Sequence, residues 1–95
     1  MKLVTIVCEA YAKNPVTKLL REVGANGWTL FPVEGDGSRG KRPADIHDFA
    51  NIQIEVVVQP EVALVLLERL EKEFFSRYAM IAFESEVRVL RQGKF

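Results

Sequence analysis

The sequence predicts an α+β fold, the ferredoxin-like βαββαβ sandwich in which two helices cover one face of a four-stranded antiparallel sheet. Four apolar runs rich in β-branched residues are separated by two stretches whose apolar residues recur with the period of a helix. Their order along the chain is β-α-β-β-α-β. The chain has 95 residues, enough for one hydrophobic core, so residues 1–95 are expected to form a single domain.

The first part of the chain is predicted to hold a strand, a helix and a second strand. Residues 3–8 are a compact β-branched run typical of a strand. Asn14 followed by Pro15 predicts the N-cap and the first residue of a helix, and Gly24 predicts its end. Residues 28–33 are then predicted to form the second strand. The helix has one apolar stripe, made of Val16, Leu19, Leu20 and Val23.

The second part begins with a predicted long loop, because residues 34–50 lose the hydrophobic period and are rich in glycine and charge. A loop of this length in a compact domain is commonly functional. Residues 52–58 alternate as a third strand, Pro60 opens the second helix, and residues 80–90 are predicted to form the last strand. The buried stripe of the second helix is predicted to consist of Val62, Val65, Leu66, Leu70 and Phe74.

The first strand is apolar on both faces. Val4, Ile6 and Cys8 lie on one face, and Leu3 and Val7 lie on the other. Because two helices cover only one face of the sheet, the second face is expected to contact another copy of the chain. We therefore expect a homo-oligomer.

Composition disfavours several classes of function. Thirteen Lys+Arg balance thirteen Asp+Glu, so the net charge of +0 gives no general attraction to nucleic acid or to anionic membranes. The sequence has no apolar stretch near the roughly 20 residues of a membrane span, and we expect a cytoplasmic protein. Cys8 is the single cysteine, and His47 stands alone in the loop. We find neither a nucleophile with its base nor a metal-ligand cluster, so neither an enzyme nor a metal site is expected.

The loop carries a glycine- and arginine-rich segment, GDGSRGKR, at residues 35–42. Glycines let backbone N–H groups approach a phosphate closely, and Ser38 adds a hydroxyl donor. Arg39, Lys41 and Arg42 supply positive charge. One hypothesis is a site for a phosphate or a small oxyanion. The other is a solvated hairpin loop, and composition does not separate the two.

Three further polar residues stand out, and two of them, Glu55 and Arg91, have two interpretations each. Thr29 and Glu55 lie inside apolar strands, which suits a cross-strand surface pair, and Glu55 would also suit an acceptor of ribose hydroxyl groups. Arg91 follows the last strand, where it belongs either to a solubilising charged tail or to a second cationic wall for a bound phosphate.

Four segments of the sequence resemble the PII signal-transduction family. They are VGANGWTL at 23–30, similar to VGxxGxT; VEGDG at 33–37, similar to the VxGxG entry to the family's T-loop; IQIEVV at 52–57, similar to KIEIVV; and VRVLR at 87–91, similar to the closing strand. The loop is shorter than in nitrogen-regulating members and lacks their uridylylation tyrosine. FFSRYAM at 74–80 replaces the glycine- and lysine-rich segment that grips ATP phosphates. In these departures the chain resembles PII-like proteins associated with bicarbonate transporters and carboxysomes.

The resemblance implies a non-enzymatic signalling homotrimer that binds an adenine nucleotide in each cleft between neighbouring chains: AMP or ADP, or else cyclic AMP or ATP. The implied nucleotide-binding residues are Thr29, Gly35, Gly37, Ser38, Arg39, Glu55, Val57 and Arg91. Bicarbonate is implied as a second ligand, with Arg39, Lys41 or Arg42 as its partners. A flexible T-loop at about residues 35–50 would regulate a bicarbonate transporter or a carboxysome component. Two alternatives remain on the same fold, a CutA-like metal-tolerance trimer and a bare oligomeric scaffold.

Overall fold

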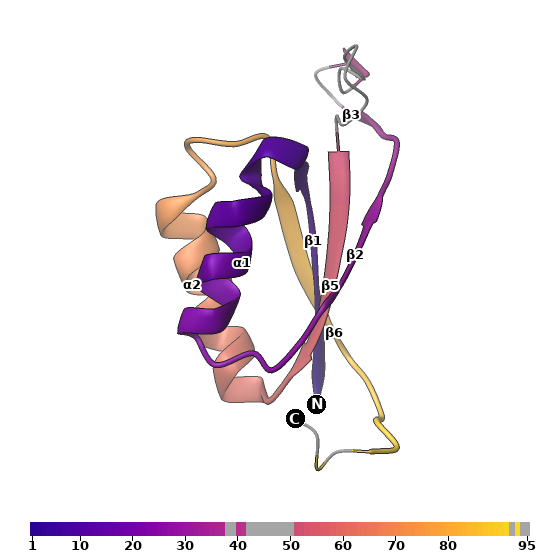
Figure 1. Ribbon diagram of the computed structural model, residues 1–95, viewed down its shortest axis with the longest axis vertical. Coiled ribbons are helices and arrows are strands. Elements are labelled where there is room, and N and C mark those ends of the chain that lie inside the picture. Colours follow the sequence, from indigo (N-terminus) through magenta and orange to yellow (C-terminus); the bar gives the residue numbers. More distant parts are fainter. Residues whose placement is uncertain (38–39, 42–50, 92, 94–95) are drawn as a thin grey trace.

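The computed structural model describes residues 1–37, 40–41, 51–91 and 93, and it has the predicted ferredoxin-like arrangement (Figure 1). The elements are β1 (Lys2–Glu9), the short 3-10 turn η1 (Ala10–Ala12), α1 (Lys13–Glu22), β2 (Thr29–Pro32), β3 (Asp36–Gly37), β4 (Gly40–Lys41), β5 (Asn51–Val58), α2 (Pro60–Glu73) and β6 (Ile81–Glu86). No helix of the described ranges is both long enough and apolar enough to cross a membrane.

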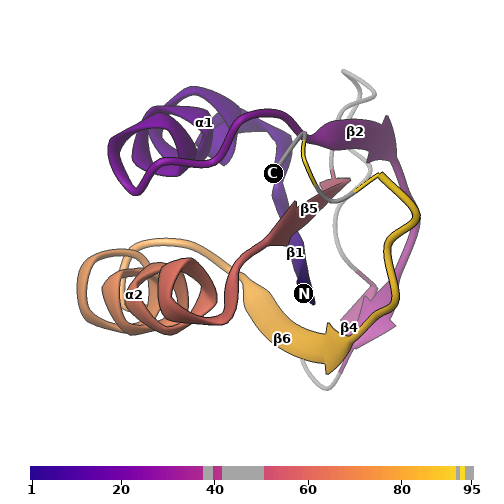
Figure 2. The same cartoon turned by 90° about the horizontal axis from the view of Figure 1, so that it is seen from below.

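The main sheet has the strand order β2-β5-β1-β6, and each neighbouring pair is antiparallel. The central strands β1 and β5 pair along eight residues each, from Lys2 opposite Val58 to Glu9 opposite Asn51. Figure 2 shows α1 and α2 beside each other on one side of the strands. The molecule therefore has two layers, and the helices leave one face of the sheet uncovered. We call this uncovered side the open face.

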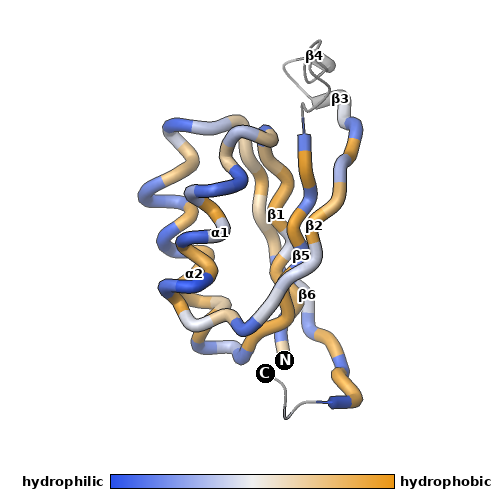
Figure 3. Tube along the Cα trace, viewed as in Figure 1, coloured by the Kyte–Doolittle hydropathy of each residue, from blue (hydrophilic) through white to orange (hydrophobic). Residues whose placement is uncertain are grey.

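The hydrophobic core fills the space between the sheet and the helices. β1 and β5 supply alternate apolar residues to it, and their course through the middle of the sheet is seen in Figure 3. The fully buried side chains of the core include Val4, Ile6, Cys8, Ile54, Leu20, Leu66 and Leu70. Burying one leucine or isoleucine contributes roughly 1.5–3 kcal/mol, so this layer accounts for the packing of both helices on the sheet.

Helix α1 differs from the prediction at its start. It begins at Lys13, with Ala12 at the N-cap, rather than at an N-cap formed by Asn14. The reason is that the 3-10 turn η1 runs directly into the helix. Pro15 is then the third helical residue, still within the first turn, where a backbone N–H has no helical partner to lose.

The end of α1 agrees with the prediction. Gly24 follows the helix with φ of 95°, a conformation that glycine adopts without steric cost. The N–H of Ala25 donates to the carbonyl of Leu20 at 2.9 Å, and the N–H of Gly24 donates to that of Arg21 at 3.1 Å. These two bonds form a Schellman motif, which turns the chain toward β2.

Helix α2 begins at Pro60, as predicted, and ends at Glu73. One member of its predicted stripe is wrong, since Val65 is 44% exposed. Ala63 is buried in its place, because it lies three residues before Leu66 and so faces the sheet with it.

Strand β6 is shorter than predicted and ends at Glu86 instead of Leu90. Its partner β1 begins at Lys2, and the last rung is the N–H of Val87 donating to the carbonyl of Met1 at 3.0 Å. A strand cannot extend past its partner, so the apolar alternation beyond Val87 has nothing to pair with.

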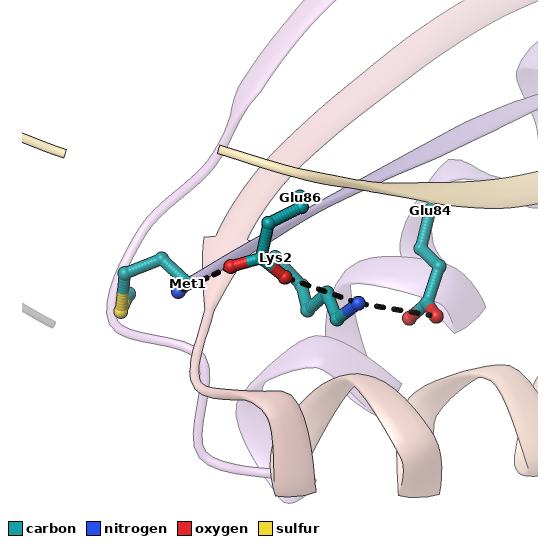
Figure 4. A network of polar contacts seen from close by, with 4 residues as sticks. All are labelled: Met1, Lys2, Glu84 and Glu86. Atoms are coloured by element: carbon teal, nitrogen blue, oxygen red, sulfur yellow. Dashed lines mark hydrogen bonds and ion pairs between the residues drawn. The ribbon is translucent and has the colours of Figure 1, made fainter. Parts of the chain in front are cut away.

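Charged residues mark this end of the sheet (Figure 4). The Nζ of Lys2 lies 3.2 Å from Glu86 and 3.8 Å from Glu84, and the amino group of Met1 lies 3.4 Å from Glu86. The hydrogen bond from Lys2, and next that from the Met1 amino group, lower the pKa of Glu86. The same bond, followed by the charge of Glu84, raises the pKa of Lys2.

Candidate functional site

The open face is divided into a polar half and an apolar half. Its middle row runs across four strands, with Thr29 opposite Glu55, Glu55 opposite Thr5, and Thr5 opposite Phe83. Phe83 is 50% exposed, and Ile81 on the same strand is 53% exposed. In this row the polar side chains lie on β2, β5 and β1, whereas the half-exposed apolar side chains Ile81 and Phe83 lie on β6; we call these the polar half and the apolar half.

The polar half is centred on the Glu55 carboxylate. The Nε2 of Gln53 donates to its Oε2 at 3.1 Å, and Thr29 lies directly opposite it as an exposed residue. A carboxylate has lone pairs left for further donors after accepting one bond, so Glu55 suits a ligand with hydroxyl or amino groups. The strand register makes Thr29 and Glu55 a cross-strand pair, which agrees with the surface-pair interpretation, and their part in binding a ligand stays a prediction.

Two residues of this half were not predicted as site residues. The Nε2 of Gln53 donates to Glu55, and Thr5 is a member of the row that is only 4% exposed. Neither residue belongs to a sequence motif that would mark it as a site residue. The signal that could have identified them is the pairing of β1 with β5, because an eight-residue antiparallel register places Thr5 opposite Glu55.

The glycine-rich segment starts at the end of β2. The N–H of Val33 donates to the carbonyl of Asn51 at 3.2 Å, and this bond closes the base of the loop. Gly35 is exposed, and Gly37 pairs with Gly40 in the two-residue ladder of β3 and β4. The predicted long loop therefore contains a short antiparallel ladder. Lys41 lies in β4 opposite Asp36, whereas Ser38, Arg39 and Arg42 lie outside the described residues.

Val57 lies two residues beyond Glu55 on the same face of β5. It also lines a hollow of about 20 Å³ between the α1–β2 connection and the start of α2. Such a volume holds about one water molecule, whereas pockets for small organic ligands measure roughly 300–1,000 Å³. The hollow is far too small for a nucleotide.

Arg91 lies at the other end of the sheet from Gly35 and Gly37. It follows β6, which ends beside the start of β1, while the glycines follow β2, which ends beside the start of β5 (Figure 1). Eight strand residues span roughly 25 Å. One chain therefore brings Thr29, Glu55 and Val57 together but does not bring Arg91 to the glycines.

A second polar cluster joins the end of β1 to the connection between α2 and β6. The Oε1 of Glu9 accepts the backbone N–H of Ala79 at 2.8 Å and the hydroxyl of Tyr11 at 3.2 Å. The Tyr11 and Tyr78 rings are 5.6 Å apart between centroids, and the Arg77 guanidinium lies 5.6 Å from the centre of the Tyr78 ring. Partial desolvation and the bond to Glu9 raise the pKa of Tyr11.

Within the ranges that the structure describes, no three or more His, Cys, Asp or Glu side chains lie close enough together to hold a metal ion. Cys8 is buried in β1, as expected for a strand residue facing the core.

Comparison with known proteins agrees with the fold. Residues 1–94 match the family model for nitrogen regulatory protein P-II. A candidate PII-like signalling protein from Thermus thermophilus is 42% identical, with a TM-score of 0.85 and coverage of 99% of this chain and 93% of that chain.

Two structures of CPII from Thiomonas intermedia are also similar. One, bound to ADP and bicarbonate, is 32% identical with a TM-score of 0.88; the other, bound to ADP, AMP and bicarbonate, is 31% identical with a TM-score of 0.89. Each alignment covers 99% of the present chain and 92% of the CPII chain. With the matched sequence segments, the strand order and the family model in agreement, the chain belongs to the PII family.

Proposed function

We propose that this protein is a non-enzymatic, PII-like signalling protein that binds an adenine nucleotide, AMP or ADP, together with bicarbonate. The single observation that carries the proposal is the polar half of the open face, in which Thr29 and Glu55 lie opposite each other on strands of a fold whose relatives bind ADP and bicarbonate. Cyclic AMP and ATP are the alternative nucleotides.

The roles of the site residues follow from their chemistry. Thr29 and Glu55 would contact the ribose and base, and the backbone of Val57 would contact the adenine. Gly35, Gly37, Ser38 and Arg39 would line the phosphate side of the ligand. Arg39, Lys41 or Arg42 would hold bicarbonate, since a small anion needs a local positive charge on a chain of zero net charge.

The proposed assembly is a homotrimer with its ligands between neighbouring chains. Two observations support this arrangement. The half-exposed Ile81 and Phe83 give β6 an apolar surface suited to a second copy. The far position of Arg91 means that it can join the glycine-rich segment only if it comes from a neighbouring chain.

We further propose that residues 1–95 act as one cytoplasmic domain whose T-loop, about residues 35–50, presents itself to a target protein according to the bound ligand. The proposed target is a bicarbonate transporter or a carboxysome component. A ligand can shift the state of a loop only by binding one state more tightly than the other, so nucleotide and bicarbonate must each favour one loop state.

Calorimetry tests the proposal. AMP, ADP, ATP and cyclic AMP are titrated into the protein, each with and without bicarbonate. We expect binding of AMP and ADP, and a roughly tenfold or greater loss for Glu55→Ala, because a lost charged hydrogen-bond partner costs about 1.5–3 kcal/mol.

Glu68→Ala is the matched control, since Glu68 is an exposed carboxylate on the outer side of α2. Heat from none of the four nucleotides would refute the proposed function and leave the oligomeric scaffold. An equal loss of nucleotide affinity in Glu55→Ala and Glu68→Ala would refute the assigned site.

A further inference from the structure

Gln53 is a polar residue in a row of the open face whose other members are apolar. On β5 it lies opposite Phe31 of β2 on one side and opposite Val7 of β1 on the other. Val7 in turn lies opposite Ile81 of β6. Because these cross-strand neighbours are apolar, the partner that the structure shows for the Gln53 amide lies on its own strand. That partner is Glu55, two residues further on and on the same face.

The bond between the two side chains holds the carboxylate in one orientation. The Nε2 of Gln53 donates to the Oε2 of Glu55 at 3.1 Å, and both residues are half-buried. A hydrogen bond that is partly shielded from water is stronger than an exposed one. It takes up one of about four lone-pair positions of the carboxylate and leaves lone pairs of both oxygens for a ligand. Without this bond the Glu55 side chain would sample other rotamers, and binding would have to order it again.

A carboxylate held in this way fits a pair of neighbouring hydroxyl groups. It only accepts hydrogen bonds, so the ligand must bring the donors. The 2′ and 3′ hydroxyl groups of a ribose are two donors side by side. Each edge of adenine instead places a ring-nitrogen acceptor beside the amino group, and the second carboxylate oxygen would repel that acceptor. The exposed Thr29, directly opposite Glu55, adds a hydroxyl that either accepts or donates.

We propose that Gln53 is a positioning residue that holds the Glu55 carboxylate toward both ribose hydroxyl groups, so that the protein selects ribonucleotides over 2′-deoxyribonucleotides. The inference rests on the proposed nucleotide-binding function and assigns the ribose end of that site. Gln53 acts through Glu55 and needs no contact with the ligand. A site built to bond a hydroxyl group rejects an analogue that lacks it, because the acceptor is then left without a donor.

The size of the effect follows from the loss of one hydrogen bond to a charged group. The wild type should bind a ribonucleotide about tenfold to 100-fold more tightly than its 2′-deoxy analogue. Gln53→Met keeps the length of the side chain but removes its donor, so this preference should fall by about threefold or more, toward that of Glu55→Ala. Gln53→Lys supplies a donor again and should keep the preference. In the Glu55→Ala background, Gln53→Met should change the preference no further.

Isothermal titration calorimetry with AMP, ADP and their 2′-deoxy analogues measures the dissociation constants, and far-ultraviolet circular dichroism verifies folding of each variant. Gln59→Met is the matched control, because Gln59 is an exposed glutamine just beyond β5 whose side chain makes no capping bond to α2. We expect the ratio of the 2′-deoxy and ribonucleotide constants to fall in Gln53→Met and to stay at the wild-type value in Gln59→Met and Gln53→Lys.

Three results would overturn the inference and leave nucleotide binding standing. The first is an equal loss of affinity for ribonucleotide and 2′-deoxy analogue in Gln53→Met. The second is a wild type that binds both with the same affinity. The third is a Gln53→Lys variant that loses the preference as fully as Gln53→Met does. A wild type that binds neither AMP nor ADP would instead refute the proposed function.

Discussion

Replacing Phe83 by glutamate should break the proposed trimer without unfolding the chain. Phe83 lies on the open face of β6 and is 50% exposed, so half of its side chain is free to contact a neighbour. In the assembly the substitution would exchange this apolar contact for a carboxylate that must lose its water.

The magnitude can be worked from the exposure. An aromatic side chain buries roughly 200 Å² in all, and the 50% that remains on Phe83 is about 100 Å². At about 25 cal/mol per Å², its burial contributes about 2.5 kcal/mol for each chain. Three chains together give about 7.5 kcal/mol, which corresponds to a loss of roughly 10⁵-fold in the assembly constant before the cost of the charge is added.

Sedimentation velocity at micromolar concentration is the assay, with far-ultraviolet circular dichroism to verify folding. Leu64→Glu is the matched control, because Leu64 is 65% exposed on α2, on the helical side of the molecule. We expect Phe83→Glu to sediment as a smaller species and Leu64→Glu to sediment as the wild type. If Phe83→Glu still sediments as a trimer, the assignment of the interface to β6 is refuted. It is also refuted if Leu64→Glu disrupts the trimer as much as Phe83→Glu does.

Two further predictions concern stability, measured as urea midpoints. Gly24→Ala should lower the stability by about 1–2 kcal/mol, because a φ of 95° strains a residue that has a Cβ. Gly27→Ala is the control and should be neutral, since an added Cβ meets no atom within 4 Å at either position. Equal losses of stability for the two variants would contradict backbone strain as the reason. Because the pKa of Glu86 is lowered in the folded state, its carboxylate stabilises the fold at pH values above about 4.5, the ordinary pKa of a glutamate. This stabilisation is lost as the pH falls through the lowered pKa. Because the pKa of Lys2 is raised in the folded state, its charge stabilises the fold at pH values below about 10.5. This stabilisation is lost as the pH rises through the raised pKa. The urea midpoint of the wild type should therefore exceed that of Glu86→Gln at pH 7, and the two midpoints should converge as the pH falls below the lowered pKa of Glu86. A difference that stays constant with pH would count against the ion pair.

The sequence predicted the elements whose own residues determine them. The β-branched runs of β1 and β5 and the stripe of α1 depend on local pattern and burial, and they lie where expected. The end of β6 depends instead on where β1 begins, which no pattern near Leu90 reveals. The start of α1 likewise depends on the preceding η1, which favoured Ala12 over Asn14 at the cap.

The site was predictable only where chemistry and position coincide. Thr29 and Glu55 are polar exceptions in apolar strands, so they were noticeable, and the register places them together. The contact of Glu9 with Ala79 was not predicted, because it joins residues 70 positions apart in the sequence. The distance of Arg91 from the glycines also follows only from the strand order.

The hydrogen bond between Val33 and Asn51 has an evolutionary consequence. It joins the residue after β2 to the first residue of β5, so insertions or deletions between these two residues leave the paired strands intact. Doubling the length of such an excursion costs only about 0.6 kcal/mol of chain entropy. Descendants of this scaffold can therefore exchange one recognition sequence for another, in length as well as in composition, with little loss of foldability.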